Sequence, residues 1–176
     1  MTLPAAIGIG IAWFLVWLFA QAAFHKISAP GYYQELVQRY VPAMGGGRMW
    51  VAMVATLETG IALCLLVPVW RSAGLIAAAA LLVVYGALMA SEMLRGRAGA
   101  QCGCAGPDSS LGVSWALVLR NGVCAALALL ALAGSGATEV SWMGFMLAAF
   151  LALFAALVYL TAEQIVSNAQ WMAEEA

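Results

Sequence analysis

Two cysteines separated by one glycine are the residues of this chain best placed for covalent chemistry. Cys102 and Cys104 stand in the run GAQCGCAGPD at positions 99–108. A disulfide across a single residue closes a small, strained ring, and strain makes a disulfide easier to reduce. Glycine neighbours allow backbone angles that other residues avoid. The pattern therefore favours thiol–disulfide exchange over a structural bridge.

Two other interpretations of the pair stay open. The thiolates could bind a metal, but no further Cys or His lies near them in the sequence, and we expect no metal site. The pair could also be incidental, or form a static bridge in a non-catalytic subunit. The other two cysteines, Cys64 and Cys124, stand inside apolar stretches, where a small buried hydrophobic residue is the better interpretation.

Ionisable and amide side chains gather on the same side as the cysteines, at the ends of the apolar stretches or inside them. Glu58 and Arg120 each lie roughly 13–14 Å into such a stretch, at about 1.5 Å per residue. A charge at this depth costs about 2.5–3.5 kcal/mol on insertion scales, so it normally faces protein. The equal depth predicts an ion pair between them. The rest of this polar cluster is Gln21, His25, Lys26, Glu92 and Asn121.

Each of these side chains also has a simpler explanation. Glu58 and Arg120 could do no more than tie two helices together. His25 could face solvent or lipid headgroups instead of transferring protons. Lys26 could extend its ammonium group to the membrane surface.

The composition places these residues in a membrane protein. Hydrophobic residues make up 65% and charged residues 9% of the 176 residues, whereas a soluble domain has about 45–50% and about 25%. A soluble surface needs more charge than this chain carries. The seven Lys and Arg residues are scattered, which excludes a basic surface for nucleic acid. The common motifs of nucleotide-binding proteins, zinc proteases and serine hydrolases do not occur in the sequence.

Five apolar stretches are long enough to cross a bilayer, which takes about 20 residues in a helix. Because only helices satisfy their backbone hydrogen bonds singly in lipid, we expect an all-α polytopic helix bundle formed by one domain, residues 1–176. No basic segment precedes the first stretch, so we expect it to be retained. The predicted spans are 5–24, 49–69, 72–94, 111–133 and 140–162.

The first long connection contains a short amphipathic helix. Apolar or aromatic residues fall at 32, 33, 36, 37 and 40, which is a helical spacing, and Pro30 and Pro42 bound the segment. Tyrosines are common at the boundary between membrane and water. We expect an interfacial helix over 30–42, between the first and second spans.

The charge pattern and the cysteine chemistry disagree on orientation. Connections 25–48 and 95–110 share one side of the membrane. They carry the positive residues Lys26, Arg39, Arg48, Arg95 and Arg97, against Arg71 on the other side. The positive-inside rule places Cys102 and Cys104 in the cytoplasm, whereas disulfides persist on the oxidising side. The side therefore stays open.

Four short motifs together resemble the MauE/DoxX-like membrane proteins over roughly residues 10–130. His25-Lys26 precedes the Pro-bounded aromatic segment, and Glu58 is followed by Gly60. The run CGCAG at 102–106 is similar to a CGCFG loop, with Ala105 where an aromatic residue is usual. Arg120-Asn121 resembles an Arg-Asn pair in the next span.

The resemblance implies a membrane thiol-redox or assembly role. It implies maturation of a methylamine dehydrogenase-type enzyme beside a thioredoxin-like partner, in the plasma membrane of a bacterium. The wider group includes subunits linked to quinone-reducing sulfur oxidation, so a membrane quinone is a candidate cofactor.

The leading hypothesis is disulfide exchange at Cys102 and Cys104, which would make the protein a thiol-disulfide oxidoreductase. Arg97, Lys26 or His25 could supply the positive charge that favours a thiolate, and Arg120 could bind a quinone oxygen. A non-catalytic anchoring or assembly subunit of a redox enzyme complex is the alternative. A small transporter with Glu58 and Arg120 lining its pathway is the third. All three place the chain among membrane lipids, without nucleic acid.

Overall fold

The computed structural model describes residues 3–40, 47–96, 103, 106, 111–134 and 141–174. Its elements are helices, which confirms the predicted all-α bundle. In chain order they are α1 (Leu3–Ser28), α2 (Pro30–Tyr40), α3 (Gly47–Leu66), η1 (Pro68–Trp70), α4 (Arg71–Leu94), α5 (Trp115–Ala131), η2 (Leu132–Gly134) and α6 (Trp142–Glu174).

Four helical segments are long and apolar enough to cross a membrane. They are Ala5–Ser28, Gly47–Leu66, Pro68–Leu94 and Trp142–Ala173. Helix α5 is equally apolar but has 17 residues, which is at the short end of the lengths that span a bilayer. These helices make the chain an integral membrane protein.

Each apolar helix differs from its predicted bounds by one residue or more, and the differences in α5 and α6 affect the site. Helix α5 begins at Trp115, not at 111, because Ser114 before it has an extended backbone (φ −147°, ψ 161°) and stands at the N-cap position. The Ser114 side chain makes no capping hydrogen bond, so the extended backbone alone marks where the helix begins. Helix α6 continues to Glu174, well beyond 162. Its last turns are rich in Ala, Gln and Glu and hold no Gly or Pro, so nothing in the sequence ends the helix earlier.

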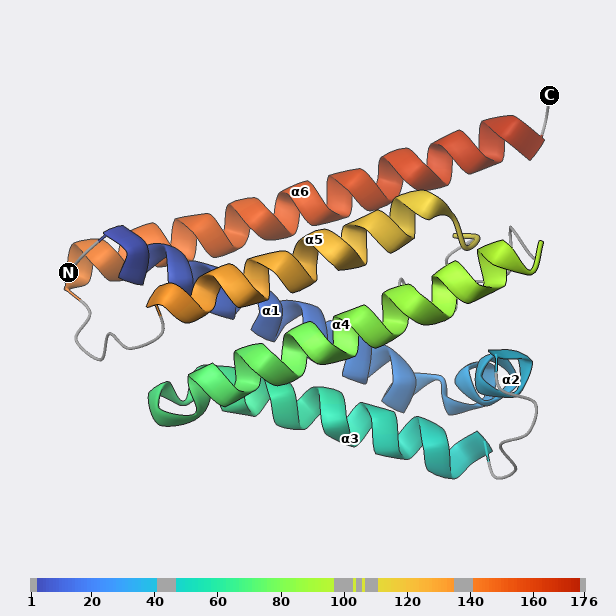
Figure 1. Ribbon diagram of the computed structural model, residues 1–176, viewed down its shortest axis with the longest axis horizontal. Helices are drawn as coiled ribbons and strands as arrows, with labels where there is room; N and C mark the ends of the chain where they lie inside the picture. Colours follow the sequence, from blue (N-terminus) through green and yellow to red (C-terminus); the bar gives the residue numbers. More distant parts are fainter. Residues whose placement is uncertain are drawn as a thin grey trace.

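The helices form a bundle in which α1 is central (Figure 1). Helix α1 packs against α3 and α6, and α4 packs against α5. Helices α3 and α4 are joined by the tight turn η1, where Gly74 lets them approach closely: a Cβ there would lie 3.0 Å from the backbone N of Leu65. From this turn α3 and α4 diverge toward the end of the bundle where α2 lies (Figure 1).

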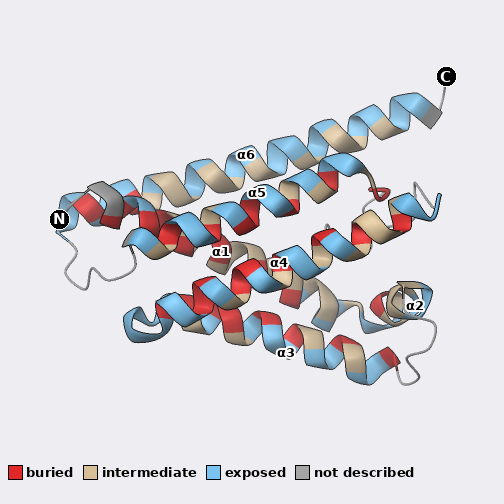
Figure 2. Cartoon of the chain, in the orientation of Figure 1, coloured by how far each residue is buried: buried red, intermediate tan, exposed pale blue. Residues whose placement is uncertain are grey.

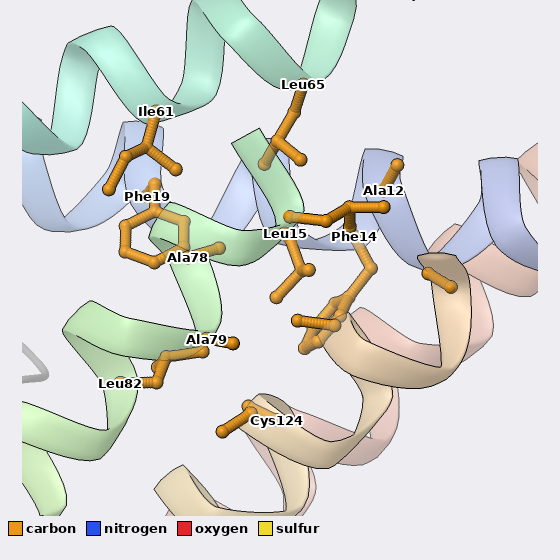
Figure 3. Close-up of a cluster of buried hydrophobic side chains, with 14 of the residues drawn as sticks. Ala12, Phe14, Leu15, Phe19, Ile61, Leu65, Ala78, Ala79, Leu82 and Cys124 are labelled. Atoms are coloured by element: carbon orange, nitrogen blue, oxygen red, sulfur yellow. The ribbon is translucent and has the colours of Figure 1, made fainter. Parts of the chain in front are cut away.

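The core lies where α1, α3, α4 and α5 meet, and it combines large side chains with alanines (Figure 3). Its large buried side chains include Phe19, Leu15 and Leu65. They pack in one cluster with small residues such as Ala78 and Ala79. In lipid, helices associate through close packing, and small residues allow that packing. Most of α6 is exposed (Figure 2). Its exposed side chains are largely apolar, as expected for a surface in contact with lipid tails.

Candidate functional site

A cavity of about 440 Å³ lies at the end of the bundle where α3 and α4 diverge. Its volume is in the usual range for small-molecule sites. All six α-helices contribute to its wall, which is mostly apolar. The apolar wall includes Leu18, Phe19, Leu36, Val37, Trp50, Met53, Val54, Leu82, Val84 and Leu88.

The exposure of two lining side chains indicates that the cavity has a mouth between α3 and α4. Met53 of α3 and Val84 of α4 line the cavity, and each is 51% exposed. These two side chains therefore belong both to the cavity wall and to the outer surface of the bundle. In a membrane protein, that surface faces lipid.

A lysine, a glutamate and a tyrosine form the polar part of the cavity. The Glu58 side chain is 0% exposed, and its Oε1 lies 2.8 Å from Nζ of Lys26. The hydroxyl of Tyr85 donates to the same Oε1 at 2.6 Å. Oε2 of Glu58 has no hydrogen-bond partner among the residues that the structure describes. The three residues come from α3, α1 and α4, so the group ties three helices together.

Lys26 is positioned by the end of α1. It stands in the last turn of that helix, where the helix dipole favours a positive charge. Its Nζ lies 5.3 Å from the ring centroid of Tyr33 and 5.7 Å from that of Tyr85. The ammonium group is thus held between a carboxylate and two aromatic faces, an arrangement that offsets part of its desolvation.

The predicted ion pair between Glu58 and Arg120 is not the pairing that the structure shows. Nη1 of Arg120 lies 3.4 Å from Oε1 of Glu163 on α6, and its guanidinium is 4.5 Å from the ring centroid of Tyr159. The prediction assumed equal depths. Because α5 starts at Trp115, Arg120 lies roughly 8 Å along its helix, whereas Glu58 lies roughly 16 Å along α3. Both side chains still line the cavity.

Some of the other members of the predicted polar cluster line the cavity, and others do not. Gln21 and Asn121 line the cavity. Nε2 of Gln21 is 3.5 Å from Nε2 of His25, while Asn121 donates to the carbonyl of Leu117 at 3.0 Å. Glu92 does not line the cavity. It is buried, and its Oε1 accepts from Nη1 of Arg95 at 3.1 Å, so its part in the cluster stays a prediction.

The residue between the two cysteines is docked against this cavity. Gly103 is buried and lines the cavity, and its carbonyl accepts a hydrogen bond from the Tyr33 hydroxyl at 2.9 Å. Its φ is +69°, and a Cβ at this position would collide with Cδ2 of Leu36. Both features favour glycine at this position. The predicted site residues Cys102 and Cys104 lie outside the described residues, as does Arg97.

A second glycine brings the same loop against α1. Gly106 is buried with φ +94°, and a Cβ there would lie 2.9 Å from Nδ1 of His25. His25 thus lies beside the cysteine loop, outside the cavity lining. The other cysteines are apart from this site: Cys124 is buried in the core, and Cys64 is half-buried.

Four residues of the site were not predicted from the sequence as members of it: Tyr33, Tyr85, Tyr159 and Glu163. A tyrosine inside an apolar span was a usable signal, since its hydroxyl needs a partner when it is buried. Tyr85 meets that description. Glu163 stands one residue beyond the predicted end of the last span, where an acidic residue is expected to face water.

Comparisons with known proteins agree on one family. Residues 4–134 match the family model of the methylamine utilisation protein MauE. The chain is 37% identical over 118 residues to the methylamine utilization protein MauE of Paracoccus denitrificans, covering 66% of this chain and 63% of that protein. It is 39% identical over 119 residues to the protein of the same name from Paracoccus versutus, with the same coverage.

The chain spans a little less than two thirds of the length of these relatives. Helix α6, which contributes Tyr159 and Glu163, lies beyond the residues matched by the family model. No solved structure matches the chain.

Proposed function

Because the chain belongs to the MauE family, we propose that it acts in methylamine utilisation as a membrane thiol-redox protein. Cys102 and Cys104 would exchange disulfides during maturation of a partner enzyme of the methylamine dehydrogenase type. The observation that carries the proposal is the buried Gly103 between the two cysteines, bonded to Tyr33 and lining the cavity.

The docked glycines support a positioned pair of cysteines. Gly103 contacts α2 through Tyr33 and Leu36, and Gly106 contacts His25 on α1. An unattached loop would hold its cysteines in many arrangements. Gly103 and Gly106 stand before and after Cys104, and we expect their contacts to limit the arrangements of the two sulfurs, which exchange with a partner needs together.

The charges near the loop favour the reactive form of a thiol. A nearby cation stabilises the thiolate, which is the nucleophile in exchange. Lys26 shares its charge with Glu58 at 2.8 Å. His25 lies beside Gly106, two residues after Cys104, so its imidazole is a second candidate for stabilising a thiolate.

The exchange reaction transfers one disulfide from this protein to its partner. A thiolate of the partner attacks one sulfur of the Cys102–Cys104 disulfide, and the other sulfur leaves as a thiolate. A second partner thiolate then resolves the mixed disulfide. The partner gains a disulfide, and Cys102 and Cys104 become a dithiol.

The proposed chemistry belongs on the oxidising, periplasmic face of a bacterial plasma membrane. Two of the five positive charges that favour the cytoplasm are held in ion pairs: Lys26 with Glu58, and Arg95 with Glu92. Lys26 is directed into the bundle and does not act as a loop charge. This arrangement weakens the charge argument for a cytoplasmic loop.

Mixed-disulfide trapping tests the proposal. Cys102→Ser and Cys104→Ser are expressed separately in cells that contain the maturation system, and membranes are separated without reductant. Exchange is reversible, so the remaining thiolate of each variant can attack a disulfide of the oxidised partner. We expect one variant to accumulate a reductant-sensitive adduct, because the second cysteine that would release the partner is missing. Cys64→Ser and Cys124→Ser are the controls and should form no adduct. Normal partner oxidation in Cys102→Ser would contradict the proposal and favour a non-catalytic assembly subunit.

A further inference from the structure

The cavity is suited to a ligand that arrives from the lipid. Its mouth lies between Met53 and Val84, which are half-exposed on the outer surface of α3 and α4. Trp50, Val54 and Leu88 continue the apolar wall inward. An ion or a sugar would have to pass this apolar mouth, whereas a lipid-soluble molecule enters it without losing hydration.

The inner part of the cavity offers hydrogen-bond acceptors that the protein does not use. Oε2 of Glu58 and Oε1 of Gln21 are buried and without a hydrogen-bond partner in the described part of the chain. Both residues line the cavity. Buried polar atoms are normally satisfied by protein, water or a ligand, so two such oxygens give the cavity two places for a donor from outside the chain.

The same place also holds a donor. An ammonium group has three N–H bonds. Among the described residues, Nζ of Lys26 has two hydrogen-bond acceptors, Glu58 at 2.8 Å and the carbonyl of Ala22 at 3.5 Å. One N–H is therefore available for a ligand oxygen. This arrangement suits a ligand whose oxygen accepts a hydrogen bond in its oxidised state and donates one in its reduced state.

We propose that the cavity binds a lipid-soluble quinone, which enters between α3 and α4 and accepts the electrons of Cys102 and Cys104. A quinone oxygen accepts from Lys26. The hydroxyl of the reduced form donates to Glu58 or Gln21. Tyr33 and Tyr85 provide aromatic faces beside the ring, and the apolar wall receives the start of the tail.

The electron transfer rests on the proposed function and balances as follows. Two thiols lose two protons and two electrons as the sulfur–sulfur bond of Cys102–Cys104 forms. The quinone gains two electrons and two protons, so both of its carbonyl oxygens become hydroxyls. One dithiol and one quinone yield one disulfide and one quinol. Gly103, the residue between the two cysteines, lines the same cavity as Glu58.

Binding is tested with purified full-length chain in detergent and decylubiquinone as the probe. Quenching of tryptophan fluorescence is the readout, and Trp50 lies in the cavity wall. We expect saturable binding that n-decanol, which has the same tail without the ring, displaces at least tenfold less well. Equal competition by n-decanol would mean that the cavity holds only a lipid chain, and quenching that never saturates would mean that there is no site. Either result overturns the proposal.

Two matched pairs of variants locate the site. Val84→Trp should block the mouth and weaken binding at least tenfold, whereas Val83→Trp, on the neighbouring exposed residue outside the cavity, should not. Glu58→Gln should weaken binding about tenfold through loss of a charged acceptor, with Glu92→Gln as the control. If Glu58→Gln fails to fold, the valine pair decides. Equal binding by Val84→Trp and Val83→Trp contradicts the assignment.

Quinone binding and disulfide exchange can be refuted independently of each other. Binding is repeated in the double variant Cys102→Ser/Cys104→Ser, and we expect it unchanged. Binding without quinone reduction by the reduced wild-type protein would overturn the electron route and leave the cavity a ligand site. Mixed disulfides with a partner, in a protein that binds no quinone, would overturn this inference and leave the proposed function standing.

Discussion

Replacement of Lys26 by Met removes the cation that neutralises a carboxylate inside the bundle. Glu58 is 0% exposed and Lys26 14% exposed, at a separation of 2.8 Å. Loss of one partner from a buried pair costs about 3–5 kcal/mol, because the remaining charge is left uncompensated. Tyr85 still donates to Glu58 at 2.6 Å, so the lower end is expected. For a chain of this size about 3 kcal/mol lowers Tm by about 6–12 °C.

Thermal unfolding of the purified protein in detergent, followed by circular dichroism, measures this loss. The double variant Lys26→Met/Glu58→Gln removes the charge together with its partner. It should therefore recover about 2 kcal/mol relative to additive losses. Arg39→Met is the control: Arg39 is an exposed arginine, so its loss should cost about 0.5 kcal/mol or less.

Two results would refute this reasoning. The first is a Lys26→Met protein as stable as Arg39→Met, which would mean that the ion pair with Lys26 does not stabilise the bundle. The second is a double variant no more stable than the single, which would mean that the charge of Glu58 is not the cause of the loss.

Three further variants test how the loop and the helices are held. Gly103→Ala should destabilise the docked loop by about 1–3 kcal/mol through its positive φ and its collision with Leu36, and we expect partner oxidation to fall, as measured by the fraction of oxidised partner. Tyr33→Phe removes the 2.9 Å hydrogen bond to Gly103, worth about 1 kcal/mol, and should speed maleimide labelling of the reduced loop about fivefold; an unchanged rate would mean that this bond does not hold the loop. Gly10→Val should cost about 1–3 kcal/mol, because even a Cβ would lie 2.9 Å from that of Leu151 on α6, and Gly31→Val, with open space around it, is the control in the same unfolding assay.

The fold class and the gathering of polar side chains could be predicted from the sequence. Long apolar runs admit few structures other than membrane helices. Gln21, Lys26, Glu58, Arg120 and Asn121 all line one cavity, as their positions along the predicted spans suggested. Distance along a helix is fixed at 1.5 Å per residue, so the end of the bundle at which a residue lies follows from the sequence.

The pairing of these side chains could not be predicted. It depends on where each helix starts and on how the helices are rotated. The four-residue shift in the start of α5, from 111 to Trp115, placed Arg120 nearer the end of the bundle, beside Glu163. Glu58 and Glu92 look equivalent in the sequence. In the structure Glu58 lines the cavity, whereas Glu92 pairs with the exposed Arg95. Helix rotation decides this, and apolar helices carry little sequence signal for it.

Thiol labelling of intact cells tests the central claim, that Cys102 and Cys104 form an exchangeable disulfide on the oxidising side. A Cys64→Ser/Cys124→Ser background leaves the pair as the only thiols. A membrane-impermeant maleimide is added before and after reductant, and adducts are read by mass. We predict labelling from outside only after reduction. Labelling without reductant, and only once the membrane is broken, would mean reduced cytoplasmic thiols and would contradict the account.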